Sequence, residues 1–263
     1  MGDKLLHNHY EAIASSYDSA WGPLNPPELI RDVVTHLGLD RQSRVLDIGA
    51  GTGLVAARIA AELRPIHPII CLDPNHSMIQ RMQQNPHLIA VRGDVEHLTG
   101  ALCGKYAPFT AVLMKDVIHH SYDIAQALAQ VLQVVAPGGT VLVVMTPRLI
   151  SYPLFSAARE LYALRQPDPA SIAASIISFG ARVSRSAGRY DISLPASRYA
   201  DMIRNRFLSV LSRFSNQEIE HGISELGINS WEHVILHMEL DFLRIELDFS
   251  RAHSATQRVV PLA

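Results

Sequence analysis

The sequence predicts an α/β fold: a doubly wound, mostly parallel, seven-stranded sheet with a helical insert or lid after the fifth strand. Two observations lead to this prediction. Between residues 44 and 145, short apolar runs alternate with stretches of helical spacing. Strands without a polar face are typical of a parallel sheet that helices bury on both sides. After residue 147 the alternation stops, and much of the chain up to residue 232 has helical spacing.

The expected elements follow in order along the chain. A short helix is expected at residues 9–20, and a second at 27–37 begins on a proline and ends before Gly38. Strands are then expected at 44–48, 68–72, 87–91, 109–114 and 140–145, with helices at 54–63, 77–84 and 124–135. In the last third, helices are expected at 148–180 and 196–226, and strands at 182–194 and 233–249.

We expect these elements to form one integrated domain with four parts. Residues 1–38 form helices that cover a bound ligand, and residues 39–147 form a Rossmann-like binding core. Residues 148–232 form the helical insert or lid with a possible strand, and residues 233–263 form the final strand and the C-terminal tail.

Composition excludes several classes of protein. The 263 residues are 48% hydrophobic, enough for a sizeable core, and the net charge of -2 offers no basic stripe for nucleic acid. No apolar run approaches the roughly 20 residues of a membrane span, and Met1 to Tyr10 does not resemble a signal peptide. Cys71 and Cys103 are the only cysteines, which fits a reducing compartment. We expect a cytoplasmic monomer or homodimer without nucleic-acid or membrane partners.

The segment VLDIGAGTG, residues 45–53, is a strand that ends in a glycine-rich turn. Glycine tolerates positive φ and has no Cβ, so a ligand can lie against the backbone. The amides at the start of the next helix favour an anionic group of that ligand. The candidate contacts are Gly49, Ala50, Gly51 and Gly53. A tight strand-to-helix turn without a ligand is the alternative.

Three carboxylates near strand ends agree with a ligand at this turn. Asp73 closes the second strand, where it can accept hydrogen bonds from ribose hydroxyls. Asp94 follows the third strand, where it can meet an amino group on a base. Asp47 would repel a pyrophosphate and attract a cationic amine. The dinucleotide fingerprint also requires a glycine where this chain has Leu54, so an NAD-dependent oxidoreductase is disfavoured.

Over about residues 10–147 the chain carries, in order, VLDIGAGTG, LDPNHSM, RGDV, KDVIHHSYD and VVAPGGTVLVV. This series resembles the successive motifs of class I S-adenosylmethionine-dependent methyltransferases of small-molecule type. The resemblance implies S-adenosylmethionine as cofactor and a small-molecule acceptor that is methylated on oxygen, nitrogen or carbon, in a biosynthetic pathway. A domain that keeps the cofactor for another reaction, such as a cyclisation, is the alternative.

The resemblance also implies positions for the cofactor contacts. These are Asp47 and Gly49 at the methionine end, Asp73 on the ribose, Asp94 and Val95 at the adenine, Met78 on the adenine face, Pro74 in the same motif as Met78, and the backbone of Lys115. The stretch YEAIASSYDSAW is similar to a cofactor-covering helix, which puts Tyr10 and Tyr17 near the methionine tail. Packing of an amphipathic helix explains these two tyrosines equally well.

Two histidines are the candidate catalytic residues. His119 and His120 follow the fourth strand, at the edge where sheets of this kind bind ligands. Histidine titrates near neutral pH and can take a proton from a hydroxyl or an amine. The alternative is that the pair only packs or orients the site. Asp116 and Tyr122 are expected to line the same pocket.

The remaining patterns favour structural roles. No metal site is expected, because the histidines lack partners at established ligand spacing. The arginines of the second half favour a solvated face with ion pairs, and the alternative is that Arg204 or Arg206 clamps an acidic acceptor. A group of apolar residues favours lid core over a pocket wall: Ile176, Ile177, Phe179, Phe207 and Phe214.

Overall fold

The computed structural model describes residues 4–83, 85–121, 123–178 and 181–246, and its seven strands form one sheet in the order β3-β2-β1-β4-β5-β7-β6. The strands are β1 Val45–Ile48, β2 Ile69–Asp73, β3 Leu88–Arg92, β4 Phe109–Lys115, β5 Val135–Met145, β6 Arg182–Pro195 and β7 His233–Glu246. The first five strands pair in parallel, and β7 runs antiparallel to β5 and β6. The predicted doubly wound, mostly parallel, seven-stranded sheet is confirmed.

Eleven α-helices lie in the described residues. They are α1 Lys4–Ile13, α2 Tyr17–Trp21, α3 Pro27–Leu37, α4 Leu54–Leu63, α5 His76–Met82, α6 Leu98–Leu102, α7 Ile124–Val134, α8 Ser156–Arg165, α9 Pro169–Ser178, α10 Ala196–Arg204 and α11 Asn216–Leu226. Short 3₁₀ turns are η1 Val95–His97, η2 Ile118–His120, η3 Ser209–Arg213 and η4 Ile228–Ser230. In this part of the chain, no helix has the length and apolar character needed to cross a membrane.

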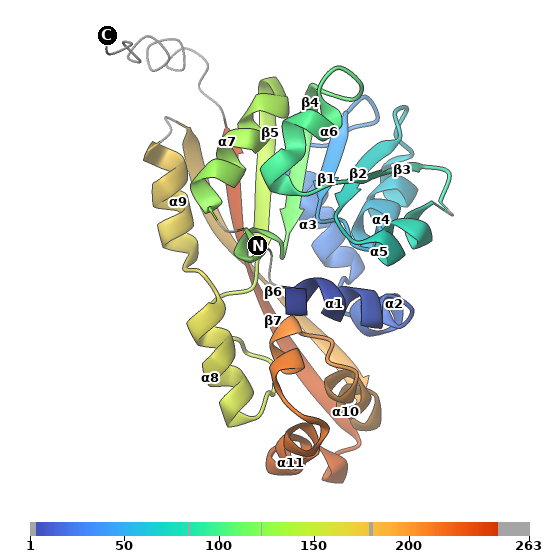
Figure 1. Cartoon of the computed structure of the whole chain (residues 1–263), viewed down its shortest axis with the longest axis vertical. Helices are drawn as coiled ribbons and strands as arrows, with labels where there is room; N and C mark the ends of the chain where they lie inside the picture. Colours follow the sequence, from blue (N-terminus) through green and yellow to red (C-terminus); the bar gives the residue numbers. More distant parts are fainter. Residues whose placement is uncertain (1–3, 84, 122, 179–180, 247–263) are drawn as a thin grey trace.

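Helices cover both faces of the parallel strands (Figure 1). Successive side chains of a strand point to opposite faces of the sheet. Val45 packs with α3 and α4 on one face, and its neighbour Leu46 packs with α6 and α7 on the other. Because these strands pair in parallel, the glycine turn after β1 and the ends of β2, β3 and β4 lie at one edge of the sheet.

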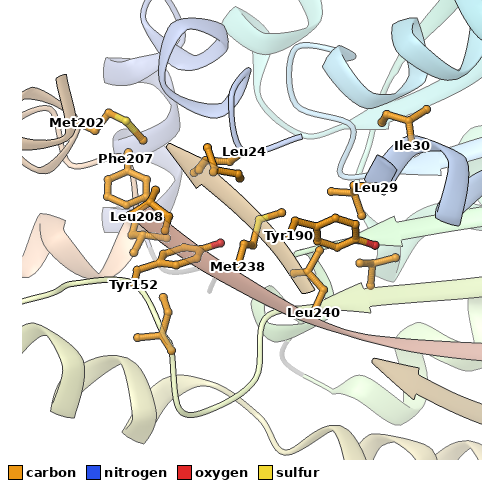
Figure 2. Close-up of a cluster of buried hydrophobic side chains, with 14 of the residues drawn as sticks. Leu24, Leu29, Ile30, Tyr152, Tyr190, Met202, Phe207, Leu208, Met238 and Leu240 are labelled. Atoms are coloured by element: carbon orange, nitrogen blue, oxygen red, sulfur yellow. The ribbon is translucent and has the colours of Figure 1, made fainter. Parts of the chain in front are cut away.

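Part of the second half of the chain, including α8, α10 and α11, extends beyond the parallel strands (Figure 1). β6 and β7 pair along their full length, but β5 pairs only with residues 241–246 of β7. The part of the β6–β7 pair that lies beyond β5 packs against α10, the segment after it and the N-terminal segment. Figure 2 shows this cluster, with labels on Leu24, Leu29, Ile30, Tyr152, Tyr190, Met202, Phe207, Leu208, Met238 and Leu240. The N-terminal helices α1 and α2 lie between the parallel strands and α10 (Figure 1).

Several predicted elements differ from the observed ones. The helix expected at 9–20 is divided into α1 and α2, and the helix expected at 148–180 is divided into α8 and α9. The possible strand at 182–194 is β6, which pairs within the sheet. The helices predicted as one insert are therefore divided into α8 and α9 before β6 and α10 and α11 after it. The predicted positions Tyr122 and Phe179, and the chain after Glu246, lie outside the described residues.

Candidate functional site

A cavity of about 780 Å³ lies at the C-terminal ends of the parallel strands, within the size range of small-molecule sites. The sequence proposed thirteen cofactor contacts and two catalytic histidines, and the cavity wall contains fourteen of these fifteen residues. They are Tyr10, Tyr17, Asp47, Gly49, Ala50, Gly51, Asp73, Pro74, Met78, Asp94, Val95, Lys115, His119 and His120. The structure therefore brings together side chains from β1 to β4 and from the N-terminal helix.

Gly49 shows why the turn after β1 needs glycine. Its φ is +67°, and a Cβ at this position would lie 2.2 Å from Cγ2 of Val117. The amides of Gly49 and Ala50 donate to the carbonyl of Leu72, at 2.8 and 3.1 Å. The turn is thus held against β2, and its backbone forms part of the cavity wall.

Gly53 is the proposed contact that does not line the cavity. It precedes α4 with φ of +77°, and a Cβ there would lie 2.7 Å from Leu88 and 2.8 Å from Met82. The position requires glycine because φ is positive and because Leu88 of β3 and Met82 of α5 pack closely against it. Its role in the structure is packing under the turn.

The Asp73 carboxylate is fixed by two backbone amides. Oδ2 accepts from the amide of Gly51 at 2.9 Å, and Oδ1 accepts from the amide of Asn75 at 2.8 Å. Asn75 in turn caps α5, since its side chain accepts from the amide of Met78. Asp73 is 7% exposed, so the glycine turn and the start of α5 hold this carboxylate in one orientation.

Asp94 has a capping role as well as a place in the cavity wall. Its Oδ1 accepts from the amide of His97 at 2.9 Å and lies 2.7 Å from Nδ1 of the same histidine. These contacts fix the carboxylate at the start of η1. The adjoining Val95 is buried and also lines the cavity.

Asp47 is the most deeply buried of the three carboxylates that the sequence singled out. Burial raises the pKa of Asp47 to about 7; the charge of Asp73 adds to this effect, and the ammonium of Lys115 opposes it. A cation placed next to this carboxyl group would lower its pKa and favour the ionised form. The site can therefore stabilise a positively charged group beside the glycine turn.

Lys115 and Asp116 form an ion pair in the wall, with Nζ of the lysine 2.6 Å from Oδ2 of the aspartate. Asp116 has φ of +53°, an uncommon backbone conformation for a residue other than glycine. Its Oδ1 accepts from the amide and the hydroxyl of Thr146, at 3.2 and 3.3 Å. Burial acts to raise the pKa of Asp116, but Lys115, with smaller effects of His119 and the amide of Thr146, lowers it, so the pKa lies below its usual value.

His119 and His120 line the cavity, and burial disfavours their protonated forms. The two rings lie 3.9 Å apart, and Nε2 of His120 lies 3.2 Å from the hydroxyl of Tyr10. Burial lowers the pKa of His119, although Asp116 opposes this, and burial lowers the pKa of His120 further. Among the described residues, Nδ1 of His119 has no hydrogen-bond partner. Both rings are therefore uncharged near neutral pH.

The helices α1 and α2 close the cavity on one side. The ring of Tyr17 stacks on Trp21, with 6.0 Å between centroids, and lies against Gly51. The side chain of Ser77 donates to Glu11, which ties α1 to α5. His9 lies 2.7 Å from the hydroxyl of Ser212, which ties α1 to η3.

Trp21, the last residue of the stretch YEAIASSYDSAW, also lines the wall. Other wall residues come from segments that carry no motif, and they include Asn25, Thr146, Tyr162, Leu208, Ser209 and Val210. Arg204 and Arg206, the possible clamp for an acidic acceptor, lie outside the wall. Arg204 pairs with Glu220 at 2.8 Å, and Arg206 donates to Asn216 at 2.7 Å. Phe207 is buried in the cluster of Figure 2.

The wall suits S-adenosylmethionine in its chemistry. Carboxylates follow one another along the sheet edge at the ends of β3, β2 and β1, where a base, a ribose and an amine would need acceptors. Met78 and Val95 add apolar surface near the first of these. The described residues hold no group of three or more His, Cys, Asp or Glu side chains that could bind a metal ion.

Comparisons with known proteins agree with this geometry. A family model described as methyltransferase domain matches residues 46–141. An uncharacterized methyltransferase of Mycobacterium bovis is 32% identical over 137 residues, which are 50% of this chain and 64% of that protein. The chain spans between 35% and 64% of the length of the curated relatives that it matches.

Solved structures share the fold at low sequence identity. One is described as a methyltransferase from an antibiotic biosynthesis pathway of Anabaena variabilis, with a TM-score of 0.59, 17% identity, and coverage of 82% of this chain and 96% of that one. Another is a phosphoethanolamine N-methyltransferase of Haemonchus contortus in complex with phosphomonomethylethanolamine and S-adenosylhomocysteine. Its TM-score is 0.56 at 17% identity, over 89% of this chain and 56% of that one.

Proposed function

We propose, since this chain has the fold of the class I S-adenosylmethionine-dependent methyltransferases, that it methylates a small-molecule acceptor. One observation carries the proposal. A single cavity at the sheet edge joins three carboxylates, Asp47, Asp73 and Asp94, to a pair of uncharged histidines. The carboxylates suit a cationic nucleoside cofactor, and the histidines suit proton removal from an acceptor.

The order of strands supports one orientation of the cofactor in the cavity. Asp94 and Met78 would receive the adenine, Asp73 the ribose, and Asp47 with Gly49 the methionine end. S-adenosylmethionine supplies, when bound, a methyl group activated on a positively charged sulfur. The acceptor would then lie beyond β4 and β5, where His119, His120, Thr146 and Tyr162 line the wall.

Tyr10 and His120 are the groups best placed to receive a proton. Burial raises the pKa of Tyr10, so its hydroxyl stays protonated and can donate to Nε2 of His120. When a hydroxyl or amine of the acceptor loses its proton, the tyrosine oxygen can take it while passing its own to His120. The carboxylate of Asp116 favours a positive charge on His119, whose ring lies next to that of His120.

Closure by α1 and α2 would exclude water from the reaction. Tyr10, Tyr17 and Trp21 all come from this segment and all line the cavity. A dry site strengthens the electrostatic interactions inside it and keeps the two reactants aligned. Two apolar wall residues, Leu208 and Val210, add a surface that suits an acceptor with an apolar body.

The proposal can be tested in two steps. Calorimetry should detect binding of S-adenosylmethionine and not of NADH, and S-adenosylhomocysteine should be released with a suitable acceptor from a panel of phenols, amines and activated carbon acids. His120→Gln should keep the cofactor dissociation constant and lower turnover roughly 100- to 10,000-fold. Binding without any methyl transfer across the panel would favour a repurposed cofactor domain, and wild-type turnover in both His119→Gln and His120→Gln would exclude a histidine base.

A further inference from the structure

Acidic side chains greatly outnumber basic ones in the cavity wall. Lys115 is the single lysine or arginine among the described residues that line the cavity. The carboxylates of the wall are Asp47, Asp73, Asp94, Glu96 and Asp116. An anionic group of any ligand in this cavity would be repelled along most of the wall, and Lys115 is the side chain that could attract it.

Lys115 is held in a fixed position. Its side chain is 9% exposed, and its ammonium lies 2.6 Å from Asp116 and 5.7 Å from the ring centre of Trp21. Asp116 is itself fixed by the amide and hydroxyl of Thr146. A lysine ammonium has three donors, and the ion pair with Asp116 uses one. The other two can therefore serve a ligand without breaking the pair.

The position of Lys115 lies beside the glycine turn. Met114 pairs with Ile48 across β4 and β1, so the next residues, Lys115 and Gly49, are level with each other at the sheet edge. Trp21, which covers Lys115, stacks on Tyr17, and Tyr17 lies against Gly51. Lys115 thus lies beside the methionine end of the cavity, on β4, while Asp73 of β2 and Asp94, just after β3, lie on the other side of β1.

We propose that the ammonium of Lys115 binds the carboxylate of the methionine end of S-adenosylmethionine, and that Asp116 positions it. This inference rests on the proposed function and adds a side-chain role to Lys115. The cofactor carries a sulfonium, an ammonium and a carboxylate. Asp47 can pair with the ammonium, and Lys115 can pair with the carboxylate. The two residues together would bind both charged groups of the amino-acid tail.

The test compares three ligands by calorimetry: S-adenosylmethionine, decarboxylated S-adenosylmethionine, and methylthioadenosine, which lacks the amino-acid tail. Lys115→Met should weaken the first by roughly 10- to 100-fold, the range for a charge-assisted hydrogen bond. It should leave methylthioadenosine unchanged, and it should not weaken the decarboxylated ligand. Lys115→Arg should restore much of the affinity for S-adenosylmethionine.

Two further variants guard against misfolding and general charge effects. The double variant Lys115→Met with Asp116→Asn removes both charges of the ion pair, so Asp116 is not left as a carboxylate without its partner. It should show the same loss of preference for S-adenosylmethionine over the decarboxylated ligand. Lys105→Met is the matched control, because Lys105 also lies over an aromatic ring, 4.9 Å from that of Tyr106, but is outside the cavity wall. It should bind all three ligands as the wild type does.

The outcomes separate the two proposals. If the wild type binds none of the three ligands, the proposed function fails. If the wild type binds S-adenosylmethionine and Lys115→Met keeps the same ratio of affinities for the carboxylated and decarboxylated ligands, the carboxylate is held elsewhere and this inference is overturned. A raised KM for the acceptor with an unchanged cofactor dissociation constant would instead assign Lys115 to the acceptor, which also overturns it.

Discussion

Asp47 is a carboxylate whose charge depends on what lies next to it. It is 3% exposed on β1, between the charges of Asp73 and Lys115. With a pKa of about 7, it is half protonated near neutral pH. A cationic ligand favours the ionised form, so ligand binding and loss of the proton are linked.

This linkage predicts that cofactor affinity falls with acidity. Above pH 7 Asp47 is ionised and attracts the ammonium of S-adenosylmethionine; below pH 7 it must first lose a proton. The dissociation constant should rise by up to about tenfold for each pH unit below 7. Calorimetry at pH 6, 7 and 8 measures this. Asp47→Asn should bind more weakly at pH 8 and lose this part of the dependence; parallel profiles for the two proteins would rule out Asp47 as the titrating group.

The sequence could predict those site residues whose chemistry is tied to a motif. Asp47, Asp73 and Asp94 are recognisable because each lies near or just after the C-terminal end of a strand, at the same edge of the sheet. Thr146 and Tyr162 could not be found in this way. Nothing in their local sequence distinguishes them from packing residues, and only the folded chain brings the end of β5 and α8 to the cavity wall.

At the level of elements, periodicity predicted long helices and buried strands well. α3 and α4 coincide with the predicted ranges, because each has an apolar face and a clear end. α6 has five residues, too few for a periodic pattern. The break between α8 and α9 was missed although Pro167 and Pro169 stand there, since the apolar spacing on both sides hid it.

The turn between β1 and α4 gives a stability prediction. Gly53→Ala should lower the free energy of unfolding by about 1–3 kcal/mol, because φ is +77° and the new Cβ would meet Leu88 and Met82. Urea denaturation measures this. Gly100→Ala is the control, because Gly100 lies in α6 with open space around a Cβ, and it should be neutral or slightly stabilising. Equal stability of Gly53→Ala and the wild type would contradict the packing role.

At the scale of the whole molecule, α1 and α2 join the two halves of the chain. Toward the core, Arg58 of α4 donates to the carbonyl of Gly22 at 3.0 Å. Toward the second half, the indole of Trp21 donates to the carbonyl of Phe207 at 3.2 Å, and Arg198 donates to that of Ser19 at 2.7 Å. The segment that covers the cavity is therefore hydrogen-bonded to both halves of the chain.

His9 makes this cover sensitive to pH. Burial, with a smaller effect of Arg206, lowers the pKa of His9 from 6.5 to about 4. The unfolded chain therefore binds this proton at a higher pH than the folded one. The stability due to neutral His9 is complete above pH 6.5 and is lost as the pH falls toward 4. At pH 5 the loss should be about 2 kcal/mol.

The measurement is urea unfolding of the wild type and of His9→Gln at pH 7.5 and pH 5. Glutamine is neutral at both values and can still bond to the hydroxyl of Ser212, which lies 2.7 Å from His9. Asp47, whose raised pKa acts in the opposite direction, and His119 and His120 titrate in both proteins, so the difference between the two slopes isolates His9. The variant should lose less stability on acidification than the wild type. Equal losses would mean that His9 is charged while α1 stays docked on η3, and that acid acts on the fold elsewhere.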